Sequence, residues 1–191
     1  MIFLKKMIDI LIHPNNFFES IKSRDGIYNA FIYYFIISIF SFVIFRLKDL
    51  LIVLRFPYYL ALGVPVSPIT PFFESILWFC ISLISSFFIA GLFHLFMRLI
   101  GKKNEFSTSY KITVYSLTPL LVFYPFFNLI LPLDIVTLVT YIIFHLYFAF
   151  LFILGFYKLY ELNKVKLILF VIFLTIVYSI YAFTIVALLM R

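Results

Sequence analysis

The sequence predicts an all-α integral membrane protein, a bundle of five transmembrane helices with an N-terminal interfacial amphipathic helix. Three observations support this class. Hydrophobic residues make up 65% of the chain and charged residues 12%, whereas a soluble domain is about half apolar and a quarter charged. Five apolar runs are each long enough to cross about 30 Å of hydrocarbon. Lysine and arginine are distributed unevenly among the segments that join these runs.

The first 26 residues are expected to lie at the cytosolic membrane surface. At about 100° per residue, Lys5, Lys6, Asp9 and His13 share one narrow arc of a helix, and apolar residues fill the rest. Such a run is too short and too charged to span a bilayer. It is typical of an interfacial helix that lies among the headgroups.

A second short helix is expected before the first span. Pro14 should end the interfacial helix, because proline disfavours helical backbone at the residue before it. Asn16 followed by Glu19 predicts an N-cap and capping box. Asp25 and Gly26 should then interrupt the chain.

Residues 27–191 form the predicted transmembrane domain. Hydropathy places its five spans at about residues 27–45, 73–97, 112–131, 135–157 and 167–190. The connection over residues 46–72 contains an amphipathic piece and then Pro57, Pro65, Pro68 and Pro71, which are incompatible with one regular helix. We expect an interfacial helix and an extended loop there; a re-entrant segment is the alternative.

Basic residues predict the orientation. Eleven of the 15 lysines and arginines fall on the side of the N-terminus and four on the other side. Because basic residues accumulate in cytoplasmic loops, the N-terminus is expected in the cytoplasm and the C-terminus outside. In a prokaryote the membrane would be the cell membrane.

Polar side chains inside the spans are the candidate functional residues, because each is costly in hydrocarbon unless it is satisfied. They are predicted to line a pocket between the second, third and fourth spans, formed by His94, Tyr115, Thr118, Asn128, Tyr141 and His145. The alternative is that they are hydrogen-bond partners that join helices. A second candidate surface, for anionic lipid or a partner, comprises Lys5, Lys6, Arg98, Lys102, Lys103 and Lys111. Topology alone could also account for these basic residues.

Several classes of function are disfavoured. No carboxylate lies at depth in a predicted span, and coupled proton or sodium transport usually needs one. The sequence has no phosphate-binding glycine loop, nucleophile elbow or paired carboxylates, so no catalytic residue, metal or cofactor is predicted. No basic stretch interleaves with aromatic residues outside the spans, which argues against nucleic acid as a partner.

Four segments resemble motifs of the Yip family, the Ypt-interacting five-span membrane proteins, in a compact prokaryotic-type form. They are His13–Phe18, Gly101–Ser107, Tyr115–Pro119 (YSLTP) and, more loosely, Gly155–Asn163. The resemblance covers about residues 11–190 and implies a five-span helical fold with a cytosolic N-terminus. Eukaryotic members bind Rab/Ypt GTPases through longer N-terminal regions. Only about 26 residues precede the first span here, so that partner is not expected.

Two functions are compatible with these features. The first is a non-enzymatic scaffold or adaptor in membrane organisation, whose partners are lipids, other membrane proteins or further copies of itself. The second is a passive conduit for lipid or a small solute through the predicted polar pocket.

Overall fold

The structure, a computed structural model, describes residues 2–24, 26–55, 69–130 and 135–189. That part of the chain is almost entirely helical and contains no strand. The helices are α1 (Ile2–Ile12), α2 (Pro14–Arg24), α3 (Ile27–Arg55), α5 (Ile69–Leu99), α6 (Phe106–Ser116), α7 (Thr118–Ile130), α8 (Ile135–Tyr160) and α9 (Lys164–Leu189).

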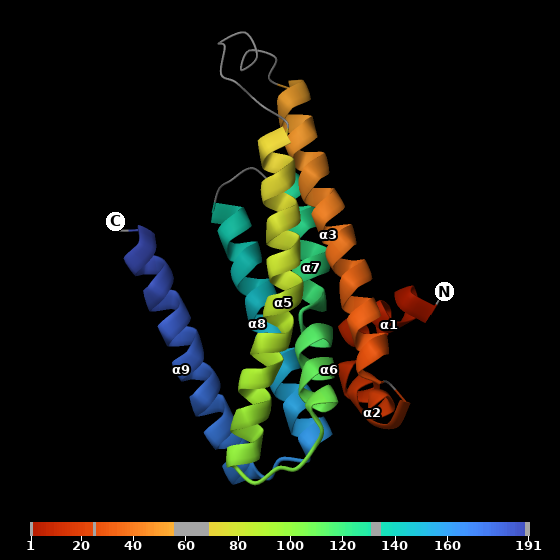
Figure 1. Cartoon of the computed structure of the whole chain (residues 1–191), viewed down its shortest axis with the longest axis vertical. Coiled ribbons are helices and arrows are strands. Elements are labelled where there is room, and N and C mark those ends of the chain that lie inside the picture. The colour runs from red at the N-terminus through yellow and green to blue at the C-terminus, as the bar shows by residue number, and fades with distance from the viewer. Residues whose placement is uncertain (1, 25, 56–68, 131–134, 190–191) are drawn as a thin grey trace.

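The long helices run roughly along one axis, and α6 and α7 follow one another between their neighbours (Figure 1). Helix α9 leans away from the bundle toward the C-terminus, and α1 and α2 pack on the opposite side. By length and composition, three helical segments of the described chain could cross a membrane: Ile27–Leu47, Phe79–Leu99 and Val139–Tyr160. The count of five crossings stays a prediction.

Helix α3 is longer than the first predicted span. It runs from Ile27 to Arg55 without a break, so residues 46–55 continue this helix and do not form a separate interfacial one. The helix continues without a break because neither proline nor glycine occurs between Ile27 and Arg55. The rest of the predicted connection, residues 56–68, lies outside the described residues. Helix α5 then begins at Ile69, with Pro71 in its first turn, where the missing N–H has no helical partner.

Helix α2 begins earlier than predicted. Asn16 is not its N-cap, since the helix starts at Pro14 and the Phe17 N–H donates to the His13 carbonyl at 3.0 Å. Proline is well suited to a first helical position, because its φ is already helical and an N–H there would be unpaired.

The third predicted span is divided into α6 and α7 at Leu117. Pro119 lacks the N–H that would bond the carbonyl of Tyr115 in a continuous helix. The Thr118 hydroxyl donates to that carbonyl instead, at 2.7 Å. The YSLTP segment therefore interrupts the helix without leaving this buried backbone oxygen unpaired.

Helix α6 occupies the centre of the bundle. Its residues Ser109–Ser116 are all buried. It packs against α3, α5 and α8, which border it on several sides. Beside it, Phe93 of α5, Phe152 and Phe156 of α8 and Phe170 of α9 form a cluster of aromatic rings.

Gly155 of α8 permits close packing in this core. A Cβ at this position would lie 2.7 Å from Ile112 Cγ2 of α6 and 2.9 Å from Phe18 Cε1 of α2. Ile112 and Phe18 are both fully buried. Gly155 thus lets two helices approach α8 at the same place, which is the usual role of small residues between membrane helices.

We predict that Gly155→Ala destabilises the fold by about 1–3 kcal/mol, because a methyl group must displace well-packed side chains. Unfolding of the detergent-solubilised protein, followed by circular dichroism, measures the change. Gly91→Ala is the matched control, since its added Cβ would meet only Phe106 Cε2 at 4.0 Å. Equal stabilities of the two variants would contradict this account of the packing.

Candidate functional site

Four polar side chains of α6 form hydrogen bonds with four different helices. The helix sequence FSTSYKITVYS is the least apolar of the helices that form the bundle. Burying it requires partners for its hydroxyls and its lysine, because unpaired polar groups are costly in an apolar interior. Partners for Ser109, Tyr110, Lys111 and Tyr115 come from α8, α5, α2 and α1, and together they define the candidate site. Thr113 Oγ1 donates to the Ser109 carbonyl within α6, and Ser116 Oγ is buried with no hydrogen-bond partner among the described residues.

Tyr115 and Thr118 lie together in a cluster that also contains Tyr33 of α3 and Lys6 of α1. The Thr118 hydroxyl gives its hydrogen to the Tyr115 carbonyl, so it accepts from the Tyr33 hydroxyl at 2.9 Å. The rings of Tyr33 and Tyr115 are 5.0 Å apart. Lys6 Nζ donates to the Tyr115 hydroxyl at 3.4 Å, so α1 covers this cluster.

His94 belongs to a second cluster, near the N-terminal end of α6. Its Nδ1 lies 3.4 Å from the hydroxyl of Tyr160, which in turn lies 2.5 Å from Ser109 Oγ. Ser109 and Tyr160 are fully buried. The chain His94–Tyr160–Ser109 therefore joins α5, α8 and α6 through hydroxyls that have no access to solvent.

Tyr141 and His145 form a third group on α8. His145 Nδ1 donates to the carbonyl of Tyr141 at 2.9 Å, and the two rings lie 3.8 Å apart. Tyr141 also meets the ring of Tyr124 on α7 at 5.3 Å. The pair is partly exposed, with Tyr141 at 39%.

The predicted pocket residues thus fall into three groups. Tyr115 and Thr118 are together, Tyr141 and His145 are together, and His94 contacts Tyr160. The side chain of Asn128 lies outside the described part of the chain. Each described member of the set bonds its own neighbours, and the role of the set in binding stays a prediction.

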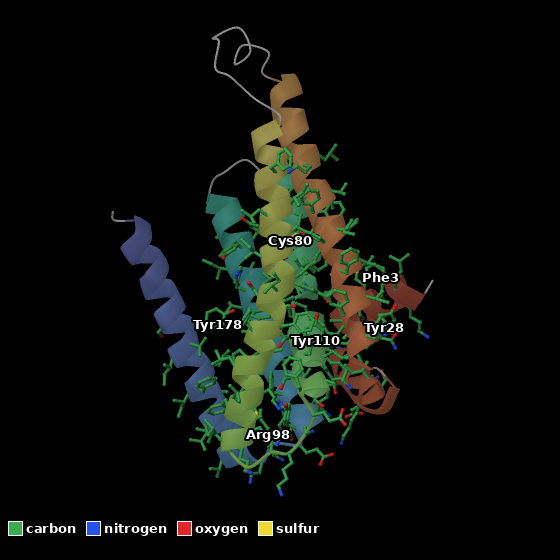
Figure 2. All side chains as sticks on the ribbon, in the orientation of Figure 1. Phe3, Tyr28, Cys80, Arg98, Tyr110 and Tyr178 are labelled. Carbon is green, nitrogen blue, oxygen red and sulfur yellow. The ribbon has the colours of Figure 1, made fainter. Side chains whose placement is uncertain are left out.

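The residues of the predicted basic surface also lie in different environments. Arg98 lies at the end of α5 (Figure 2) and, like Lys103, is exposed. Lys102 Nζ donates to the Glu161 carbonyl at 2.8 Å, and Asn104 Nδ2 donates to the Leu159 carbonyl at 3.1 Å. These two side chains satisfy carbonyls at the C-terminal end of α8, which the helix itself leaves unpaired.

Lys111 is not part of an exposed surface. Its side chain is buried, at 5% exposure, and Nζ donates to the carbonyl of Ile21 in α2 at 3.3 Å. A buried ammonium group needs such a partner, because burial of an unpaired charge is far more costly than burial of a neutral group. Lys111 therefore connects α6 to α2.

Two ion pairs fix α2 to the end of α8. Lys158 Nζ lies 2.6 Å from Glu19 Oε1, and Lys22 pairs with Glu161. The hydrogen bond and charge of Lys158 hold the pKa of Glu19 below its ordinary value, and Lys22 does the same for the pKa of Glu161. Both carboxylates are exposed, so each pair adds only a modest stabilisation.

Ser109, Tyr160 and Tyr33 were not among the predicted site residues. Tyr33 is one of many aromatic residues in the first span, and Tyr160 lies just beyond the predicted end of the fourth. Ser109 precedes the predicted third span. Periodicity could not select them, because their importance comes from contacts between residues 51 to 85 positions apart.

The apolar helices, the buried polar side chains of α6 and the exposed large hydrophobic side chains define an all-helical integral membrane protein. The chain belongs to the Yip1 family: the family model of the Yip1 domain matches residues 8–186, which is nearly the whole chain. A comparison with curated proteins gave no match, and neither did a comparison with solved structures.

We predict that Tyr160→Phe destabilises the protein by about 1–2 kcal/mol, because the buried Ser109 hydroxyl loses its partner. Ser109→Ala serves as the second single variant in a double-mutant cycle of unfolding in detergent. The double variant should lose less than the sum of the single losses, since both changes remove the same hydrogen bond. Strictly additive losses would contradict the contact.

The ion pairs of α2 predict a dependence of stability on acid. A carboxyl whose folded pKa is lowered stabilises the fold at pH values above its unfolded pKa, and that stabilisation is lost as pH falls through the folded pKa. The temperature at the midpoint of unfolding should therefore decrease as the pH is lowered below 4.5, the ordinary pKa of the Glu19 and Glu161 carboxyls. A Glu19→Gln/Glu161→Gln variant should show a shallower drop over the same range. Identical profiles would refute the assignment.

Proposed function

We propose that this Yip1-family membrane protein is a non-enzymatic scaffold or adaptor that acts through helix packing and contacts with lipids or other membrane proteins. The observation that carries the proposal is that the polar side chains of α5, α6 and α8 bond one another. Polar groups that line a route for solute would instead be directed toward a water-filled space. Their arrangement favours a rigid bundle over a conduit.

The proposed topology has five crossings, with the N-terminus in the cytoplasm and the C-terminus outside. The α5–α6 loop and the α8–α9 turn meet at one end of the bundle, where Lys102 bonds the Glu161 carbonyl. This end carries Lys102, Lys103, Lys164 and Lys166. Basic residues near the ends of spans favour the cytoplasmic side.

Two of the exposed basic side chains of this end, Arg98 and Lys103, are the proposed contact points for a partner or anionic lipid. Lys102 is less suitable for a test, because it also caps α8. Neither Arg98 nor Lys103 belongs to the buried core, so both can be changed with little effect on folding.

We predict that Arg98→Glu/Lys103→Glu reduces assembly with itself or with membrane partners, because reversed charges repel an acidic surface or lipid. Native mass spectrometry of complexes released directly from the membrane measures this. His145→Leu is the matched control and should retain assembly. Proteoliposomes should show the same solute and lipid flux as protein-free vesicles.

A monomer without bound partner or lipid under native conditions would contradict the scaffold proposal. Flux above the protein-free level that falls in His145→Leu would instead support the conduit. The two functions therefore give opposite results with the same variants.

A further inference from the structure

Helix α2 has one apolar and one polar face. Phe17, Phe18 and Ile21 are buried against the bundle, at 4%, 0% and 3% exposure. The opposite face is exposed and consists of Asn15, Asn16, Glu19, Ser20 and Lys22. Such a face is costly to place against acyl chains, because no water is present there to satisfy it.

Contacts fix the height of α2 along the bundle. Phe18 meets Gly155, and Lys22 pairs with Glu161, so α2 lies beside the last two turns of α8. Phe93 of α5 packs against Phe156 of α8 at 5.7 Å. The end of α5 therefore lies at the same height as α2.

At that height the other side of the bundle is largely apolar, and the exposed cations Arg98 and Lys164 lie at its end. Helices α5 and α9 expose large hydrophobic side chains there: Leu92 (45%), Leu95 (63%), Leu99 (84%), Val165 (66%) and Ile168 (59%). Figure 1 shows α9 and the α1–α2 pair on opposite sides of the bundle. Exposed apolar surface of this extent belongs in the acyl-chain region.

Helix α1 lies across the bundle axis, above α2 in Figure 1. The Tyr147 hydroxyl donates to the Leu11 carbonyl at 2.7 Å, which places the end of α1 near the middle of α8. Phe3, labelled in Figure 2 beside α3, meets the Tyr33 ring at 5.2 Å. An apolar row of α1 remains exposed: Leu4 (56%), Ile8 (49%) and Ile12 (63%).

We propose that α1 and α2 form a surface for phospholipid headgroups, and that the cytosolic leaflet therefore meets the two sides of the bundle at different heights. On one side α1 lies at the boundary, with its apolar row toward the acyl chains and α2 among headgroups. On the other side acyl chains extend to Leu99 and Val165. Helix α1 lies beside Tyr147 of α8, and α8 ends 13 residues later at Tyr160. At 1.5 Å per residue, the two heights of the leaflet boundary differ by a distance on the order of 20 Å.

Charge and continuity favour lipid headgroups as the occupant of the α2 face. The face carries two ion pairs, Glu19–Lys158 and Lys22–Glu161, and so offers both signs of charge to a phosphate and an amine. The apolar row of α1 next to it needs acyl chains at the same site. A phospholipid supplies both chemistries in one molecule.

Nitroxide labels on the full-length protein test the inference. Cys80 is the single cysteine, so a Cys80→Ala background accepts one label at Ser20→Cys of α2 or at Leu95→Cys of α5. In vesicles of zwitterionic and anionic phospholipid, collision with oxygen reports acyl chains, and collision with a water-soluble nickel chelate reports headgroups or water. The oxygen-to-nickel ratio at Leu95 should exceed that at Ser20 several-fold, although both lie at one height.

Labels on α1 supply an independent measurement. The label at Ile8→Cys should collide mainly with oxygen, whereas that at Lys5→Cys should collide mainly with nickel. An exposed site of the α5–α6 loop, Glu105→Cys, gives the aqueous reference, and thermal unfolding verifies that each variant is folded. These readings do not depend on whether the protein assembles with partners.

Three results would overturn the inference. An oxygen-dominated label at Ser20 would place α2 among acyl chains. A label at Ser20 shielded from both reagents would mean that protein, such as a second copy, covers this face. Equal ratios at Ser20 and Leu95 would mean that the leaflet meets both sides of the bundle alike.

Discussion

Burial of the polar helix α6 at the centre of an otherwise apolar bundle is the constraint on which the rest of the structure depends. Ser109, Lys111 and Tyr115 are all buried, and each bonds a different helix. In soluble proteins the hydrophobic effect drives helices together. In hydrocarbon that force is weak between apolar helices, so specific packing and hydrogen bonds must select the neighbours. The buried polar side chains thus determine which helices surround α6.

The N-terminal helices follow from the same constraint. Lys111 directs its ammonium to the Ile21 carbonyl, and Lys6 reaches the Tyr115 hydroxyl. Gly155 then makes room for Phe18. The α1–α2 pair therefore packs against the same helices that surround α6. This is why its polar outer face can influence how the bundle sits in the leaflet.

The division of the predicted polar set into three groups bears on function. The sequence does not specify which neighbouring helix each histidine or tyrosine side chain faces. With the sequence alone, these side chains can therefore be grouped into one shared pocket. Contacts assign His94 to Tyr160 and His145 to Tyr141, both through bonds that restrain the side chains. A network of mutually bonded groups contributes rigidity and specificity of packing. Rigidity is a property that a scaffold requires.

The sequence by itself determined the membrane class, the helical character of the chain and the family resemblance, because these depend on local composition, spacing and motifs. It also located the YSLTP segment, though not the break at Leu117, which depends on how Thr118 satisfies the carbonyl that Pro119 leaves unpaired. Only the tertiary structure decided the partners Ser109, Tyr160 and Tyr33 and the burial of Lys111. Those features arise from contacts between distant segments, and a single sequence carries no periodic signal for such contacts.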